Sequence, residues 1–284
     1  MSHQETSQKV AALYNEVSYV AFGEDYFPVV KSLGLTAQEF SQFAKGKRAL
    51  EVGCGGGQLT AFLARNFDHV TAIDISSSSL NIARQQNAKL GINNVEFLEA
   101  NLFDDAFVSK YLESFDFILC YGVLHHTANP KEGYERLVKM LKVGGSLTVG
   151  VYSRTQILYR IKRKIVLWLA GDDWKKREHL ANRLWFGGKG NRVSIFDGYV
   201  HPQVSFHSIV QVYEWAKNNR LSYISSWPLF ELRWYWDKLL KRKIVTKNYR
   251  SWNYNGLAFF LVELVWVLIG KSVMVSMSVK KIKK

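Results

Sequence analysis

The strongest constraint on this chain is the alternation of apolar runs with amphipathic segments between residues 48 and 153. Strand-like runs stand at 48–52, 69–75, 95–102, 115–124 and 146–153. Segments with helical spacing of apolar residues stand between most of them. Strands that alternate with helices at this spacing form right-handed βαβ units and a parallel sheet. The sequence therefore predicts an α/β fold.

Beyond Ser153 the alternation breaks and then returns. Residues 154–205 are basic, aromatic and irregular, whereas 207–220 predicts a helix, and 221–228 and 272–280 predict strands. The late strands fit naturally into the first sheet, so we expect one domain over 1–284. Its expected parts are an N-terminal helical cover (1–45), a cofactor-binding core (46–153), an insertion or lid (154–205), and the C-terminal part of the sheet (206–284) with a second insertion at 229–270.

The charge is unevenly distributed. The net charge is +14, yet residues 1–150 hold 13 Lys/Arg against 16 Asp/Glu, and residues 151–284 hold 25 against 8. Such asymmetry concerns partners and not the fold. The whole basic excess lies in the second half of the chain.

The location expected from the sequence is cytoplasmic. The two cysteines, Cys54 and Cys120, cannot form a disulfide framework, which indicates a reducing compartment. The N-terminus has no apolar core of the signal-peptide kind. The most apolar run, 256–270, is short for a membrane-spanning segment and contains Glu263, so a buried helix is favoured.

A glycine-rich loop follows the first strand, in the stretch LEVGCGGGQL at 50–59. The dinucleotide fingerprint needs a third glycine where this chain has Gln58, and a P-loop needs a Gly-Lys-Ser/Thr ending that is absent. The loop is therefore not expected to hold a phosphate. Asp74 follows the second strand, and a carboxylate at that distance from Gly55 can accept both hydroxyls of a ribose. This pair suits a nucleoside that carries an amino-acid tail.

These motifs resemble the class I S-adenosylmethionine-dependent methyltransferases. The resemblance is carried by Glu51-x-Gly53-x-Gly55-x-Gly57, by Asp74, and by the segments VEFLEANLFD and FDFILCYGVLHHTANPKEGYERLVKMLKVGGSLTVGVY. The core motifs are similar to those of ubiquinone and menaquinone biosynthesis methyltransferases, and the outer segments look like an uncharacterised bacterial branch. The resemblance covers 48–153 and 196–228. It implies a doubly wound, mostly parallel seven-stranded Rossmann-like sheet with an antiparallel last strand and two insertions.

The resemblance also implies a cofactor, S-adenosylmethionine, and a set of contacts for it. Gly53, Cys54, Gly55 and Gly57 would form the loop along the methionine moiety, with Glu51 shaping the turn. Asp74 would hold the ribose. Around the adenine would lie Ile75, on its face, and Asn101 and the Leu102 backbone, at its amino group. Tyr121 and Gly122 would face the transferred methyl.

Few catalytic residues are needed, because the sulfonium is already an activated leaving group and the protein supplies alignment. Candidates for a catalytic contact are Tyr121, His125, His126 and His201. The motif histidines 125 and 126 have a structural alternative, which we favour, and His201 fits a substrate contact as well as a turn. His207 is expected to be structural. No His/Cys spacing predicts a metal site.

The acceptor is left open between three interpretations of the basic, aromatic insertions. The first is a lid over a small-molecule or lipid-linked acceptor, with basic residues that form a solvated face or attract an anionic substrate such as a carboxylate or a phosphorylated sugar. The second is contact with a membrane surface, as by a membrane-associated lipid methyltransferase. The third is RNA, which ranks last because no RNA-binding module is recognisable. A non-catalytic cofactor-binding subunit is a further alternative.

Overall fold

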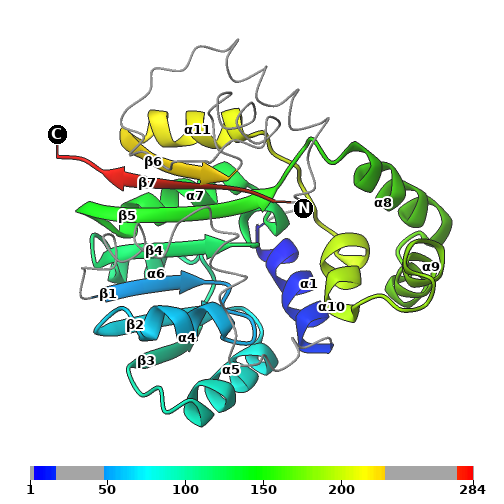
Figure 1. The fold of residues 1–284 in the computed structure, drawn as a ribbon, viewed down its shortest axis with the longest axis horizontal. Coiled ribbons are helices and arrows are strands. Elements are labelled where there is room, and N and C mark those ends of the chain that lie inside the picture. Colours follow the sequence, from blue (N-terminus) through cyan, green and yellow to red (C-terminus); the bar gives the residue numbers. More distant parts are fainter. Residues whose placement is uncertain (1–2, 17–47, 228–273, 284) are drawn as a thin grey trace, which may run out of the picture.

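A computed structural model describes residues 3–16, 48–227 and 274–283, and these form one seven-stranded sheet with helices on both faces (Figure 1). The strand order is β3-β2-β1-β4-β5-β7-β6. All neighbours from β3 to β5 run parallel, and β7 runs antiparallel to both β5 and β6. The strands are β1 (Arg48–Val52), β2 (His69–Asp74), β3 (Val95–Glu99), β4 (Phe115–Tyr121), β5 (Leu141–Tyr152), β6 (Leu221–Trp227) and β7 (Met274–Lys281). The expected doubly wound sheet with an antiparallel last strand is confirmed.

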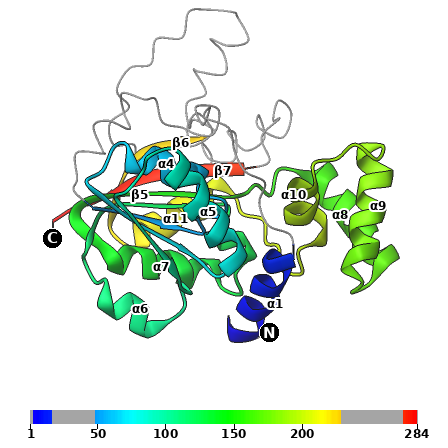
Figure 2. The same cartoon turned by 90° about the horizontal axis from the view of Figure 1, so that it is seen from below.

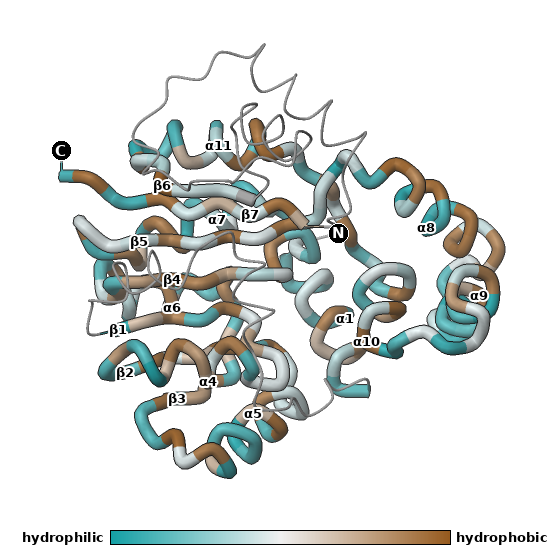
Figure 3. The backbone as a smooth tube through the Cα atoms, in the orientation of Figure 1, coloured by the Kyte–Doolittle hydropathy of each residue, from teal (hydrophilic) through white to brown (hydrophobic). Residues whose placement is uncertain are grey.

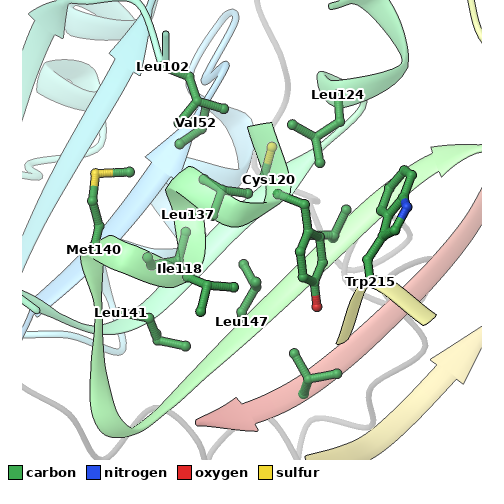
Figure 4. Close-up of a cluster of buried hydrophobic side chains, with 14 of the residues drawn as sticks. Val52, Leu102, Ile118, Cys120, Leu124, Leu137, Met140, Leu141, Leu147 and Trp215 are labelled. Carbon is green, nitrogen blue, oxygen red and sulfur yellow. The ribbon is translucent and has the colours of Figure 1, made fainter. Parts of the chain in front are cut away.

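The two faces of the sheet hold separate cores. Side chains alternate along β4. On one face Ile118 belongs to a cluster with Leu137 and Trp215 (Figure 4). On the other face Phe117 clusters with Leu63. The helices are α4 (Gln58–Ala64) and α5 (Ser77–Lys89) on one face, and α6 (Asp105–Lys110), α7 (Pro130–Met140) and α11 (Ile209–Asn218) on the other. Each large side chain buried there contributes about 1.5–3 kcal/mol.

Local sequence sets where these helices begin. Ser76 accepts a hydrogen bond from the Ser79 N–H and caps α5, and Asn129 accepts one from the Glu132 N–H and caps α7. Helix α7 stops at Met140, because β5 begins at Leu141 and pairs with the start of β4 before the register shifts.

Segments outside the sheet gather beyond the carboxyl ends of β4 and β5 (Figures 1 and 2). They are α1 (His3–Glu16), the 3₁₀ turn η1 (Leu124–His126), α8 (Ile157–Ala170), α9 (Trp174–Phe186), α10 (Arg192–Ile195) and the π-helical turn η2 (Phe196–Val200). The expected second insertion, 229–270, and most of the N-terminal cover, from residue 17, lie outside the described residues.

A search of the described residues for a membrane-crossing helix found none with the length and apolarity required.

Candidate functional site

The candidate site is a cavity of about 430 Å³ at the carboxyl ends of β1, β2 and β4. β1 lies between β2 and β4, so chain connections diverge on either side of it and leave a crevice, the usual ligand position in an open α/β sheet. Helix α1 lies across the crevice and lines it with residues at helical spacing. These are His3, Thr6, Ser7, Val10 and Tyr14.

The glycine loop and Asp74 are in direct contact. The Gly55 N–H donates to Asp74 Oδ2 at 2.8 Å, and the Ser76 N–H donates to Oδ1 at 2.9 Å. Gly53 and Gly55 both have positive φ, 72° and 50°, which turns the chain back along the end of β1. All three of Gly53, Gly55 and Asp74 line the cavity. The two motifs, which follow different strands in the sequence, therefore form one wall.

Gly57 is not among the lining residues of the cavity, and its expected place along the methionine moiety stays a prediction. It stands at the start of α4 with φ 86° and faces α5, where an added Cβ would lie 2.9 Å from the Ala83 Cβ. Gly56 and Gln58 are the lining residues at this point of the loop. Gly57 is needed for packing between two helices.

Two buried carboxyls stand beside the loop. Burial raises the pKa of Glu51 to about 8, although the Thr60 hydroxyl donates to it at 2.5 Å. Burial also raises the pKa of Asp74, against the lowering effect of its backbone hydrogen bonds. Asp197 is a third acid at the cavity, and no Lys or Arg is among the described lining residues. A ligand with positive charge would favour the ionised form of these carboxyls.

Burial keeps the loop thiol in its protonated form. Cys54 lines the cavity, and burial raises its pKa well above the ordinary value, so the thiolate is disfavoured. Cys120 is fully buried in β4 and its pKa is raised for the same reason.

The expected adenine end holds Ile75, Asn101 and Leu102, which all line the cavity. The Asn101 amide already donates to Ser7 Oγ at 2.9 Å, and its oxygen accepts from the Phe103 N–H at 3.0 Å. An asparagine amide has two N–H donors and an oxygen with two lone pairs, so it has capacity for one more bond of each kind. Asn101 also ties α1 to the sheet.

The opposite end of the cavity is aromatic. Tyr121 at the end of β4 lines it, and Gly150 on β5 makes room for that ring, because a Cβ at residue 150 would overlap the Tyr121 ring. Tyr152 at the end of β5 lines it too and stacks on the His125 ring, with centroids 3.9 Å apart.

His125 and His126 both line this end. His125 is fully buried, burial puts its pKa well below the ordinary value, and neither ring nitrogen has a partner among the described residues. His126 Nδ1 lies 2.9 Å from the Gln203 carbonyl oxygen, which can only accept, so Nδ1 carries the proton and Nε2 keeps a lone pair. Burial lowers the His126 pKa to about 4, so the ring is neutral at physiological pH.

His201 is not among the lining residues, which favours the turn role over the substrate contact, and both stay predictions. Its ring lies behind His126, with centroids 3.8 Å apart, and its Nδ1 accepts from the Gln203 N–H. His207, expected to be structural, bonds to Ser205 and Gln211. In the described part of the chain, no group of His, Cys, Asp and Glu is arranged to hold a metal ion.

Comparison with known proteins identifies a domain within the chain. Residues 50–147 match the family described as "Methyltransferase domain". The chain carries a class I S-adenosylmethionine-dependent methyltransferase domain. It is 32% identical over 109 residues to a ubiquinone biosynthesis O-methyltransferase of Marinobacter nauticus, covering 38% of this chain and 45% of that protein. A ubiquinone biosynthesis O-methyltransferase of Xylella fastidiosa is 36% identical over 110 residues, covering 39% of this chain and 44% of that protein.

The chain spans less than half the length of these curated relatives. Among solved structures, PKMT2 from Rickettsia typhi has a TM-score of 0.58 at 16% identity, covering 90% of this chain and 52% of that one. This likeness shows the methyltransferase fold.

The cofactor of the methyltransferase domain is S-adenosylmethionine, and the residues present fit it. The ligand is cationic at sulfur and at the amino group, and the cavity is acidic with no Lys or Arg in its described lining. The Asp74 oxygens accept from the backbone N–H groups of Gly55 and Ser76, and a carboxylate has further lone pairs for ribose hydroxyls.

Several lining residues were not predicted from sequence. Tyr152 could have been found, since it ends a parallel strand at the ligand edge of the sheet. The lining residues of α1 recur at helical spacing but resemble an ordinary amphipathic helix. Nothing in the sequence pointed to Asp197 as a lining residue, because its position depends on how the insertion folds back onto α1. In the structure its carboxylate accepts a hydrogen bond from the Tyr14 hydroxyl of α1 at 2.7 Å.

Proposed function

We propose that this methyltransferase methylates a hydroxyl group of an uncharged small-molecule or lipid-linked acceptor. One observation carries the proposal. A single cavity has the Gly55–Asp74 wall at one end and two buried histidine rings at the other. The ring nitrogens of His125 have no hydrogen-bond partner among the described residues, and His126 keeps a lone pair on Nε2. Buried polar atoms that line a cavity are usually satisfied by what fills it.

When bound, S-adenosylmethionine supplies a methyl group on a positively charged sulfur, which leaves as a neutral thioether once the acceptor oxygen has taken the methyl. The chain's own residues orient the acceptor and remove its proton. His126 Nε2 accepts the hydroxyl proton as the new oxygen–carbon bond forms. Because a methylated, still protonated oxygen is very acidic, even a weak base such as His126 suffices.

Several observations favour an uncharged, hydroxylated acceptor. The described lining offers no cation for a phosphate or carboxylate. Tyr121, Tyr152 and the histidine rings form flat walls for a planar group, and a neighbouring oxygen on the acceptor would pair with His125. The curated relatives are named for O-methylation in ubiquinone biosynthesis. RNA, the third sequence interpretation, would bring phosphates to an acidic cavity.

The test is transfer of an isotope-labelled methyl group to a panel of phenols, alcohols, amines and carboxylates, with and without a prenyl tail. We expect label on hydroxylated, uncharged members. His126→Ala should lower kcat about 100-fold, with measurable activity left, and should leave cofactor affinity unchanged. Unaltered kcat in this variant would remove His126 from the mechanism.

The alternative of a non-catalytic subunit has a separate outcome. It predicts cofactor binding with no labelled product from any member of the panel. Selective labelling of amines or phosphorylated members would instead contradict the acceptor class.

A further inference from the structure

Helix α8 presents an apolar stripe to solvent. The stripe consists of Ile157, Leu158, Ile161, Ile165, Trp168 and Leu169. Trp168 is 82% exposed and Leu158 67%, which is unusual for large apolar side chains that recur on one helix. At about 100° per residue the six positions fall within one sector of about 120°. They form one continuous face.

The opposite face of α8 is already packed. Arg163, Val166 and Ala170 are buried there, and Val166 belongs to a small core shared with α9, α10 and η2. Figures 1 and 2 show α8 and α9 at the far side of the molecule from β1–β3. Figure 3 shows hydrophobic and hydrophilic residues alternating along α8. The stripe therefore lies on the face of α8 opposite the one that packs on α9, α10 and η2.

Cationic side chains border the stripe on both sides. On the helical wheel Arg160 and Lys164 lie along one border and Lys162 along the other, and α8 contains no acidic residue. Residues 154–192 hold eleven Lys/Arg and three Asp/Glu. Two of these acids directly follow α8 and are engaged, since Asp172 pairs with Arg177 and Asp173 caps α9. The field around the stripe is positive.

We propose that α8 binds the surface of an anionic lipid bilayer, lying in its plane with the stripe in the headgroup–acyl boundary. A helix with an apolar face containing Trp, Leu and Ile, bordered by Lys and Arg, has the chemistry of this interface. At 14 residues it is about 21 Å long, shorter than a membrane-spanning helix. The proposal specifies a helix and a face for the membrane contact considered from sequence.

Other occupants fit less well. A second copy docked on the same face would bring two cationic borders together. A nucleic acid would meet mainly aliphatic side chains, where unpaired bases need aromatic ones for stacking. Anionic lipid satisfies both the apolar centre and the positive borders.

The docking helix also supports the acceptor end of the cavity. From the packed face of α8, Arg163 donates to the Gly198 carbonyl at 2.9 Å and to the His201 carbonyl at 2.7 Å. His201 in turn packs on His126. Building on the proposed function, docking would place the acceptor end of the cavity near the bilayer, where a lipid-linked acceptor resides.

The test is flotation of the full-length protein with vesicles of phosphatidylcholine alone and with vesicles of phosphatidylcholine mixed with phosphatidylglycerol. We expect binding to the anionic vesicles and at least tenfold weaker binding to the neutral ones. Leu158→Glu/Trp168→Glu should reduce anionic binding at least tenfold, and so should Lys162→Glu/Lys164→Glu. Leu112→Glu, at a residue 53% exposed after α6, is the matched control and should bind like wild type.

Further readouts separate the other outcomes. Calorimetric affinity for S-adenosylmethionine should be unchanged in all variants, so failure of docking and failure of the proposed function are distinguishable. Equal binding of wild type and Leu158→Glu/Trp168→Glu to anionic vesicles would overturn the proposal. A melting temperature several degrees lower in that variant would also overturn it, because it would mean that other parts of the chain cover the stripe. A change from dimer to monomer in that variant would overturn it too, because it would mean that a second copy covers the stripe.

Discussion

At the scale of single residues, Glu51 connects the site to stability. Its pKa is raised from 4.5 to about 8 in the folded chain, so the fold binds this proton more tightly than the unfolded chain does. The stabilising contribution is complete below pH 4.5 and is lost as the pH rises through 8. Glu51→Gln should therefore flatten the pH dependence of unfolding free energy between about pH 5 and 8 by on the order of 3 kcal/mol.

Denaturant unfolding of both proteins at several pH values measures this effect. Glu99→Gln, at an exposed position on β3, is the control and should follow the wild-type curve. Parallel curves for wild type and Glu51→Gln would show that burial does not perturb this carboxyl.

Two glycines with the same backbone angle separate strain from packing. Gly57 and Gly122 have φ of 86° and 85°, but an added Cβ at Gly57 meets α5, whereas at Gly122 it meets no atom within 4 Å. Gly122→Ala should cost about 1–2 kcal/mol from backbone strain alone. Gly57→Ala should cost roughly 3 kcal/mol or more, since overpacking is added. Equal losses in thermal unfolding would refute the packing role assigned to Gly57.

At the scale of elements, Arg163 joins α8 to η2 and the histidines. Arg163 is 5% exposed and donates to two backbone carbonyls. The pKa of His126 is lowered mainly by burial and further by the positive charge of Arg163. We expect Arg163→Leu to cost about 3 kcal/mol, because it leaves two buried carbonyls unsatisfied. As a positioning residue it should also move the acidic limb of the kcat–pH profile upward from about pH 4.

The conservative Arg163→Lys provides the matched comparison for this prediction. It keeps the charge near His126 and so should keep the position of the acidic limb, even where stability falls. If the acidic limb of the kcat–pH profile lies at the same pH in Arg163→Leu as in wild type, the role of Arg163 is structural only.

Most elements of the sheet were predictable because their signals are local. Apolar runs ended by glycine define β1 and β4, and capping residues such as Ser76 and Asn129 mark the helix starts. The end of α7 was not predictable from periodicity, since Leu141 continues its apolar spacing while pairing with Phe115 of β4 draws the chain into β5. Competition between a helix and a neighbouring strand is a tertiary effect.

At the scale of the whole molecule, the cofactor wall was predictable and the acceptor end was not. Gly55 and Asp74 follow adjacent parallel strands, so the fold class alone brings them to the same edge of the sheet. The acceptor end depends on how residues 154–205 fold back. Arg163 and the Gln203 backbone place His126, and no periodicity in the sequence reports those contacts.

The central claim is that Gly55 and Asp74 together bind S-adenosylmethionine, and calorimetric titration of the cofactor tests it most directly. Two lost charge-assisted hydrogen bonds predict at least 100-fold weaker binding for Asp74→Ala with the fold intact by circular dichroism. Asp116→Ala, which removes a carboxylate at the opposite end of the sheet, should bind within about threefold of wild type. Equal affinity of Asp74→Ala and wild type would contradict the account.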